Sequence, residues 1–382
     1  MSGMKKLFAV LALLFLALSA FAENKALKPA GSGSKEDPFQ ISRIEHLVWM
    51  GDNMRDVAEK NFKMTADIDA SETKTWHNSR GFLPIGFIKE QKPSYSSVSF
   101  CGTFDGGGHV ISNLFIDRKD QCAALFSSIG VPLSKYDFTA NVLENLSRRS
   151  KNCATIKDLA LVNCSFTGWN LAAGLAGKIE SSLISGVYVS GRLKSYRLTA
   201  GFAEIVNNSC LDECEIDLNF ENRSCDAVCF FSKSQNSGLK NCLSKGSFQY
   251  SEDGNCGPSI KLEYNHPAYS IGIRPKDLSF YSISISGEGR PSFCNCLVLN
   301  SILSTKRKER LFYFPDSGNV QNSFYSADNL QKKPKEKSGC GLPNKKLMEK
   351  ETYVDWDFDS VWEIEDWKSF PRLQRIEKML KR

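Results

Sequence analysis

Asp105 and His109, four positions apart, are the two residues of this sequence best placed to form an acid–base pair. A carboxylate beside an imidazole can orient the ring while the ring takes up or releases a proton, as a polysaccharide lyase or hydrolase requires. Three glycines separate them, and glycine supplies the positive-φ conformations of a tight turn. The sequence therefore favours a structural interpretation, in which Asp105 caps a glycine turn and His109 begins the next strand.

Carboxylates elsewhere offer a weaker catalytic candidate. Asp67, Asp69, Asp105 and Asp117 could gather on one face, and glycoside hydrolysis needs two carboxylates at a defined separation. Acidic residues at strand ends are also common without any catalytic role. The sequence contains no zinc-protease helix motif, nucleophile elbow, Walker loop or dinucleotide-binding glycine motif. We predict no catalytic residues and no cofactor; the alternative is a carbohydrate-active enzyme, either a polysaccharide lyase or a glycoside hydrolase.

Aromatic side chains are the remaining candidates for ligand contact. Some of these rings are expected simply to cover the core, but rings in or beside loops can also stack on sugars or pack against a partner protein. The rings expected in such places are Trp76, Trp169, Phe248, Tyr250, Tyr264 and Tyr281.

The longest interruption of the strand pattern, residues 250–292, combines aromatic with basic residues. Loops of this length tend to be functional or disordered. We predict that a glycan or a cell-envelope or surface protein binds here, with the rings supplying contact area and Lys261, Arg274 and Lys276 supplying orientation. The predicted partner-binding residues are Tyr250, Tyr264, His266, Tyr269 and Tyr281. The alternative is that the segment folds over the sheet as a local cover.

A repeat of 27 residues in the region 156–248 provides the scaffold for these groups. Ala160, Val187 and Cys214 are 27 apart, and Cys242 follows 28 later. Each unit consists of short runs of alternating apolar and polar residues broken by Gly, Asn and Ser, which is typical of strands. A unit that cannot bury its own apolar face must stack on copies of itself. The period predicts an all-β solenoid of parallel strands with these four residues stacked in one inward column.

Other positions support the same scaffold. Leu175, Phe202 and Cys229 form a second column with 27-residue spacing. Two segments, 131–153 and 250–292, break the period, and we predict that they are loops inserted between repeats.

The ends of such a stack need covering, because the outermost strands are unpaired edges. Ser42 and Glu45 match a helix capping box, and the apolar residues that follow them have a helical period. We predict an N-terminal capping helix at residues 39–61, and in 329–382 a lysine-rich linker followed by a C-terminal cap.

Residues 174–177, Gly-Leu-Ala-Gly, resemble the signature of the GLUG-motif repeat family, and other segments resemble further parts of that family. The segment 31–42 is similar to its N-terminal segment, 62–69 to its first strand, 100–114 to its central coil, and 356–373 to its closing element. The resemblance covers nearly the whole mature chain. It implies a bacterial, secreted or surface-located, right-handed parallel β-helix, and it does not imply a reaction.

Residues 1–22 are predicted to be a signal peptide. Lys5 and Lys6 precede an apolar stretch, and residues 20–22, Ala-Phe-Ala, form an A-x-A cleavage site. We expect a secreted, extracellular or cell-surface protein, or a periplasmic one, without a later membrane span. Removal of residues 1–22 leaves 47 Lys and Arg against 43 Asp and Glu, a net charge of +4. This charge does not indicate nucleic-acid binding.

Thirteen cysteines in an exported chain raise the question of disulfides. The odd number leaves at least one unpaired, and several occupy the inward columns, where free cysteine packs as a small apolar residue. Cys210, Cys214, Cys225 and Cys229 have a spacing that could bind zinc, but two of them belong to the columns. We predict core packing rather than a metal site, with disulfides between neighbouring repeats as an open alternative.

The predicted order is a signal peptide, a linker at 23–38, the capping helix, a β-helix at 62–328 and the C-terminal cap. We predict a non-catalytic, exported rod that acts as a surface binding, adhesion or structural module.

Overall fold

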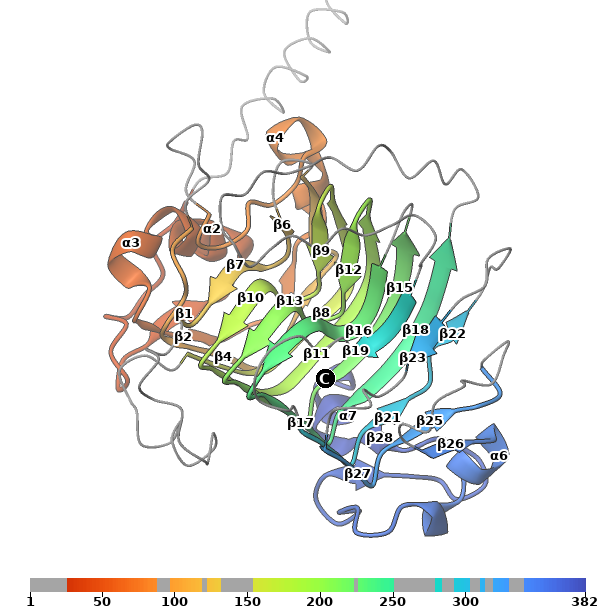
Figure 1. The fold of residues 1–382 in the computed structure, drawn as a ribbon. Coiled ribbons are helices and arrows are strands. Elements are labelled where there is room, and N and C mark those ends of the chain that lie inside the picture. The colour runs from red at the N-terminus through yellow and green to blue at the C-terminus, as the bar shows by residue number, and fades with distance from the viewer. Residues whose placement is uncertain are drawn as a thin grey trace, which may run out of the picture.

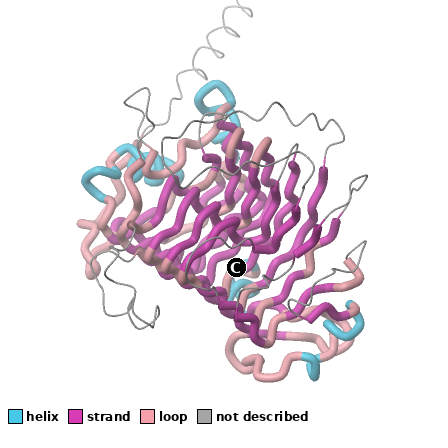
Figure 2. The backbone as a smooth tube through the Cα atoms, in the orientation of Figure 1, coloured by secondary structure: helices cyan, strands magenta, loops and turns pink. Residues whose placement is uncertain are grey.

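The computed structural model describes residues 26–87, 97–118, 122–131, 154–222, 226–250, 279–283, 292–302, 310–312, 319–329 and 340–382. This part of the chain is mostly β. Its strands stack side by side along one direction, from β1 at one end to β26 at the other, and short helices lie outside the strand layers (Figure 1). Figure 2 shows the strands as continuous layers bordered by turns. The prediction of a mostly-β fold with long parallel sheets is confirmed.

Within the described residues, the larger sheet, called sheet A, has 17 strands, and its ladders are parallel. They are β1 (Phe39–Ile41), β2 (Asn61–Met64), β3 (Ile68–Asp69), β4 (Thr103–Ser112), β5 (Phe115–Arg118), β8 (Thr155–Gly168), β11 (Leu183–Ser195), β14 (Cys210–Asp212), β15 (Glu215–Asn222), β17 (Gly238–Lys240), β18 (Leu243–Tyr250), β20 (Ser292–Cys294), β21 (Leu297–Val298), β22 (Ser301–Ile302), β24 (Asn319–Gln321), β25 (Phe324–Ser326) and β26 (Cys340–Leu342).

The smaller sheet, called sheet B, is also parallel and has 9 strands in the described part of the chain. They are β6 (Cys122–Ala123), β7 (Phe126–Ile129), β9 (Leu171–Ala173), β10 (Ala176–Glu180), β12 (Leu198–Ala200), β13 (Ala203–Asn207), β16 (Asp226–Gln235), β19 (Ser279–Ile283) and β23 (Arg310–Phe312). An antiparallel pair joins β27 (Trp362–Glu363) to β28 (Arg372–Leu373). The helices are α2 (Ile44–Asp52), α3 (Met54–Val57), η1 (Ser71–Thr75), α4 (Trp76–Ser79), α6 (Asn344–Leu347), η3 (Lys350–Thr352) and α7 (Gln374–Leu380).

Successive repeats pair with the spacing that the sequence predicted. Tyr188 of β11 pairs with Glu215 of β15, 27 positions on, in a parallel ladder. Because neighbouring parallel strands lie about 4.8 Å apart, equivalent side chains stack into columns along the molecule. Val187, Cys214 and Cys242 are fully buried in one apolar core, as predicted for that column.

Ala160 does not belong to this inward column, and the prediction was wrong for it. The register between β8 and β11 is 28 residues here, so Leu159 pairs with Val187 and Ala160 with Tyr188. A shift of one residue turns a side chain to the opposite face of a strand. Leu159 therefore takes the inward place, and Ala160 packs in a separate apolar cluster on the outer face of sheet A.

The second predicted column has a similar one-residue error. The N–H of Leu175 donates to the carbonyl of Phe202, and the N–H of Phe202 donates to the carbonyl of Phe230. The rings of Phe202 and Phe230 are stacked, with centroids 5.7 Å apart. Phe230 rather than Cys229 therefore continues the column, because the spacing between paired residues is already 28 where β16 begins, at Leu198 and Asp226, and remains 28 along β16.

Left-handed backbone positions bend the chain at the same place in successive repeats. Asp158, Glu213 and Asn241 have φ between 51° and 53°, at positions equivalent to Gly186 with φ 60°. Asn295 has φ 53° at the same place further along. Asparagine and aspartate tolerate this conformation better than other non-glycine residues, for which it costs about 1–2 kcal/mol. We call these aligned positions the corner column.

The N-terminal helical region differs from the prediction in two respects. Residues 39–41 form strand β1, which pairs with β2, so a helix does not occupy the whole of 39–61. Helix α2 begins at Ile44 with Arg43 at its N-cap, and no side chain caps it. Instead, the N–H of Ser42 donates to Nδ1 of His46, so the predicted capping box does not form. Helices α2 and α3 still lie at the β1 end of the stack, and their apolar residues join its core (Figure 1).

The predicted insertions lie largely outside the described residues. Of 131–153, only residue 131 is described. Within 250–292, strand β19 pairs in parallel with β16 and with β23, so this segment contributes a strand to sheet B and is not a loop throughout. The strand pattern was missed because flanking turn residues dominate the sequence there.

The C-terminal residues 340–382 cover the outer face of sheet A. Strand β26 pairs with β25 at the end of the sheet, and helix α7 lies against β4, β8 and β11. An apolar cluster forms between this segment and the sheet; its central members are Tyr188, Leu243, Leu297, Tyr353, Trp356, Trp362, Leu373, Ile376 and Met379. The predicted closing cap is therefore also a lateral cover.

The inward column generates a stability prediction. We expect Val187→Asp to lower the free energy of unfolding by at least about 3 kcal/mol, because the carboxylate would lie unpaired between apolar neighbours in both adjacent repeats. Chemical denaturation of the variant and of Lys194→Asp, a change on the outward face of the same strand, provides the comparison. Equal stability of the two variants would show that the column is wrongly assigned.

Candidate functional site

The predicted acid–base pair of Asp105 and His109 is not formed. One carboxylate oxygen of Asp105 accepts a hydrogen bond from the N–H of Gly107 at 2.8 Å. The other is 3.0 Å from Nζ of Lys157 in the next repeat. Asp105 therefore caps a glycine bulge, where Gly107 and Gly108 have positive φ, as predicted. Strand β4 continues through this bulge to Ser112, so the prediction that His109 begins the next strand was wrong.

His109 pairs with a different carboxylate, that of Asp67. Nδ1 of His109 lies 3.0 Å from Oδ1 of Asp67, and the same oxygen accepts the N–H of Val110 at 3.0 Å. The hydrogen bond from the Val110 N–H, which has the larger effect, and the interaction with the imidazole hold the pKa of Asp67 below its usual value. The Asp67 carboxylate is 60% exposed, so this pair lies at the surface. Such a pair can orient an imidazole for proton transfer.

The other predicted carboxylates do not join these residues in one site. Asp69 accepts hydrogen bonds from Asn113 at 2.9 Å and from the N–H of Ser71 at 3.0 Å. The backbone N–H of Asp117 donates to the carbonyl of Arg80 at the far end of β5. Asp69 therefore stabilises a local turn, and Asp67, Asp69 and Asp105 each accept hydrogen bonds from different partners.

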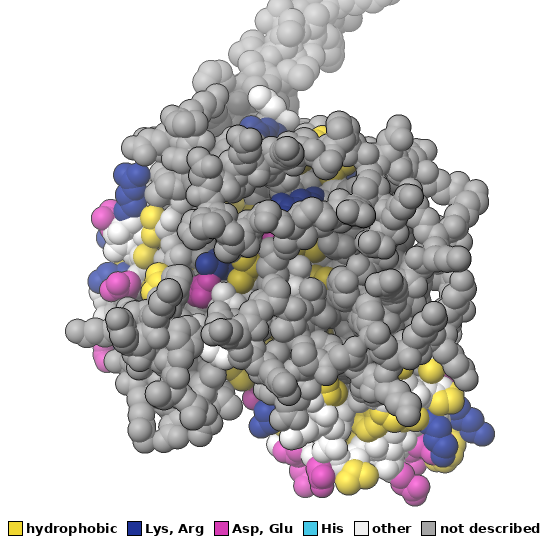
Figure 3. All heavy atoms as spheres, in the orientation of Figure 1, with side chains coloured by type: hydrophobic (Ala, Val, Ile, Leu, Met, Phe, Trp, Pro, Cys, Tyr) yellow, Lys and Arg dark blue, Asp and Glu magenta, His cyan; other side chains and the backbone are white. Residues whose placement is uncertain are grey.

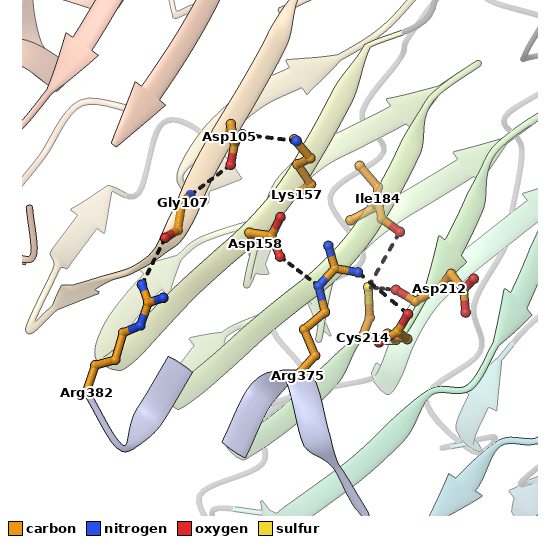
Figure 4. A network of polar contacts seen from close by, with 10 residues as sticks. Asp105, Gly107, Lys157, Asp158, Ile184, Asp212, Cys214, Arg375 and Arg382 are labelled. Carbon is orange, nitrogen blue, oxygen red and sulfur yellow. Dashed lines mark hydrogen bonds and ion pairs between the residues drawn. The ribbon is translucent and has the colours of Figure 1, made fainter. Parts of the chain in front are cut away.

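The C-terminal helix adds cations to this face that the sequence analysis did not connect with it. Nε of Arg375 donates to Oδ1 of Asp158 at 2.7 Å, and its Nη1 lies 3.6 Å from Oε1 of Glu213. Arg382 donates to the carbonyl of Gly107 at 3.1 Å (Figure 4). These contacts join residues more than 160 positions apart, and no local pattern signals them.

A buried ion pair lies on the same outer face of sheet A. Nζ of Lys245 is 2.6 Å from Oε1 of Glu215, whose side chain is 2% exposed. Oε2 of Glu215 has no hydrogen-bond partner. Burial outweighs the attraction of Lys245 and, with Asp217 and Glu377 nearby, raises the pKa of Glu215 to about 7.

The aromatic candidates fall into two groups. Trp76 and Phe248 are buried and pack in the core. Trp169, in the turn between β8 and β9, is 38% exposed, and its ring packs against that of Tyr196 in the next repeat, with centroids 4.3 Å apart and ring planes tilted by 31°. The sequence analysis identified Trp169 but not Tyr196, because their stacking depends on the repeat register.

The turn that carries Trp169 lies beside a region of unusual backbone. His77, Asn78 and Ser79 of α4 all have positive φ, between 51° and 61°. The buried Arg118 donates to the carbonyls of Phe82 and Gly81 under this turn. Arg118 also pairs with Gly168, the residue before Trp169, so the two turns occupy the same edge of the molecule (Figure 1).

Two of the five predicted partner-binding residues, Tyr250 and Tyr281, belong to the described part of the chain. Tyr264, His266 and Tyr269 lie outside the described residues. The backbone of Tyr250 pairs with Asn222 at the end of β18, and that of Tyr281 pairs in β19. These two thus belong to different sheets.

A further exposed tryptophan lies in the C-terminal segment. Trp367 is 57% exposed, and Nζ of Lys345 lies 5.9 Å from the centroid of its ring. Figure 3 shows hydrophobic, basic and acidic side chains together at this end of the molecule. In the sequence this tryptophan was part of the predicted cap.

Ten of the thirteen cysteines are described, and these are free thiols. Cys225 of the possible zinc series lies outside the described residues, and the described part of the chain contains no cluster suited to a metal ion. In that same part, no helix has the length and apolar character needed to cross a membrane.

The similarity of this chain to a solved structure extends over more of its length than its sequence similarity to a curated protein. No family model matches the chain. Halomucin of Haloquadratum walsbyi is 31% identical over 166 residues, which is 39% of this chain and 2% of halomucin. The chain thus spans a very small part of that relative. The crystal structure of a Bacteroides ovatus protein described as a candidate immunoglobulin A1 protease aligns with a TM-score of 0.58 and 14% identity, covering 90% of this chain and 94% of that one. This similarity shows a shared fold.

The Glu215–Lys245 pair predicts a pH dependence of stability. The folded pKa of Glu215, about 7, exceeds its unfolded value near 4.5, so folding takes up a proton between these values. The folded state therefore loses stability as pH rises from about 5 to 8, by up to about 3 kcal/mol from this group. We expect Glu215→Gln to remove this slope, as measured by urea unfolding at several pH values. A slope that persists unchanged in the variant would contradict the assignment.

Proposed function

We propose that this chain is a right-handed parallel β-helix, related to GLUG-motif proteins, that is exported and acts as a non-catalytic surface binding module. The parallel ladders with 27- or 28-residue spacing and the bent corner column support the β-helix. The signal-peptide pattern of residues 1–22 supports export. The ligand that we propose is a glycan or a cell-envelope or surface protein.

The exposed Trp169 on the edge of the stack is the observation that carries the binding proposal. Large aromatic rings are usually buried, and exposed ones are enriched where proteins bind partners or sugars. Trp169 is held in place from one side by the Tyr196 ring, so little side-chain entropy is left to lose on binding. Arg197, which is exposed beside Tyr196, can donate hydrogen bonds to hydroxyl or carbonyl oxygens of a ligand.

The strained turn of α4 supports a binding site at the same edge of the molecule. Three consecutive non-glycine residues with positive φ store strain, and such strain is concentrated at functional sites. The buried Arg118 stabilises the turn through the carbonyls of Gly81 and Phe82. A rigid turn beside a rigid aromatic pair gives a preorganised surface.

A binding assay with matched tryptophan variants tests this proposal. The mature protein is incubated with insoluble plant and microbial polysaccharides, and the fraction depleted from solution is measured. For a polysaccharide that binds, we expect Trp169→Ala to weaken binding at least 10-fold. Trp367→Ala, which removes a more exposed ring in the C-terminal segment, is expected to leave binding unchanged. Equal binding by the Trp169 variant would exclude this edge as the site.

A carbohydrate-active enzyme is the second candidate, and the Asp67–His109 pair is the observation that favours it. Incubation of the same polysaccharides with the mature protein, followed by assays for reducing ends and unsaturated products, tests this alternative. We expect no product. Product release that is lost in His109→Ala and retained in His46→Ala, a change in helix α2, would replace the binding proposal with an enzymatic one.

A further inference from the structure

A row of apolar side chains crosses the outer face of sheet A beneath the C-terminal segment, and one acid interrupts it. The parallel ladders pair the members of this outer row in the order Val110, Ala160, Tyr188, Glu215, Leu243, Leu297 and Phe324. All except Glu215 belong to the apolar cluster under residues 340–382 or pack against it. Glu215 is buried with them, since its side chain is 2% exposed.

The contacts of Glu215 favour a neutral carboxyl group. Oε1 lies 2.6 Å from Nζ of Lys245, but Oε2 has no hydrogen-bond partner among the described residues. A buried carboxylate needs partners for both oxygens, whereas a neutral carboxyl group loses less on leaving water. Burial, opposed by Lys245 and assisted by Asp217 and Glu377, raises the pKa of Glu215 to about 7.

The charges around Glu215 balance only when it is neutral. Lys245 interacts with Glu215 and also with Asp217, its ladder partner on β15. Glu377 of helix α7 approaches from the other side and pairs with Lys381 at 3.3 Å. Two cations therefore oppose two acids while Glu215 carries its proton, and they oppose three acids when that proton is lost.

Helix α7 packs on β4, β8 and β11 beside the outer row. Arg375 holds its first turn through Asp158 and Glu213. The next turn carries Glu377, which is paired within the C-terminal segment itself. Burial raises the pKa of Tyr188, the neighbour of Glu215 on β11, so its hydroxyl adds no charge near neutral pH. Loss of the Glu215 proton thus adds repulsion between the sheet and the turn that carries Glu377.

We propose that the contact between Glu215 and the C-terminal segment is a pH-sensitive switch, in which loss of the Glu215 proton releases helix α7 from sheet A and exposes the outer row. The release is local, because the repeats stay stacked through their ladders and their inward core. In acidic medium the row stays covered. The switch is separate from the Trp169 edge and does not depend on the proposed binding function.

The direction of the effect follows from proton binding. Glu215 keeps its proton up to about pH 7 in the closed form, but only up to about pH 4.5 in the open form, where water surrounds it. The open form therefore gains over the closed form as pH rises between these values, by about 10-fold per pH unit. Above about pH 7 the gain levels off, because the carboxyl group is then ionised in both forms.

Amide hydrogen exchange of the full-length mature chain between pH 5 and 8 tests the switch, with each rate divided by its intrinsic rate at the same pH. We expect the protection of α7 amides to fall about 10-fold per pH unit up to about pH 7, while far-UV circular dichroism stays constant. Amides of β15 should remain more protected than those of α7 at each pH. Glu215→Gln, which has the size of the protonated side chain and cannot ionise, should keep its pH 5 protection throughout.

Two further variants serve as controls. Glu221→Gln removes an acid of the same strand that pairs with Arg192 at an exposed place, so the pH dependence in α7 should remain. Glu377→Gln removes the acid on α7 that raises the pKa of Glu215, so the fall should level off at a lower pH. This variant also provides the test if Glu215→Gln does not fold.

Three results would overturn the proposal. The first is protection of α7 that does not change with pH in the parent chain, and the second is an undiminished fall in Glu215→Gln. The third is equal protection of α7 and β15, since the opening would then be global. A fall in α7 that occurs in the parent chain and in Glu221→Gln, but not in Glu215→Gln, supports the switch.

Discussion

The register between repeats is the constraint on which the rest of the structure depends. Each repeat satisfies its backbone N–H and C=O groups on the next through parallel ladders, so the chain must bend at the same place in every repeat. The corner column meets this requirement with left-handed residues at equivalent positions, at Asp158, Gly186, Glu213 and Asn241. When the corners align, the inward side chains of successive repeats stack on one another. Even small residues such as Cys214 and Cys242 then fill the core.

The same alignment brings side chains of successive repeats together at the surface. Trp169 and Tyr196 are adjacent because the turns after β8 and β11 are stacked, and their rings meet at 4.3 Å. Asp158 and Glu213 flank Gly186 because they are corner residues of three successive repeats. Stacking of parallel repeats thus places side chains that are evenly spaced along the chain in a row along one axis of the molecule.

The outer face of sheet A carries apolar side chains outside the main core, and the C-terminal segment covers them. Tyr188 and Leu243 point away from the interior and would be exposed without the C-terminal segment. Trp356 and Trp362 cover them, with ring centroids 4.3 Å apart, and Arg375 attaches α7 at the edge through charge. Burial of apolar surface stabilises the contact but is non-directional, so it does not define where the segment lies. The ion pairs have a defined geometry and fix its position.

The sequence by itself determined the strand period, the parallel mostly-β architecture, the inward places of Val187 and Cys214, and the capping role of Asp105. These features repeat or are local, so that a few neighbouring residues decide them. Only the tertiary structure decided the places of Ala160 and Cys229, since one extra residue in a repeat changes which face a side chain takes. It alone also brought Asp67 to His109 and Arg375 to Asp158, because contacts between distant segments arise from how the repeats stack and where the C-terminal segment folds back.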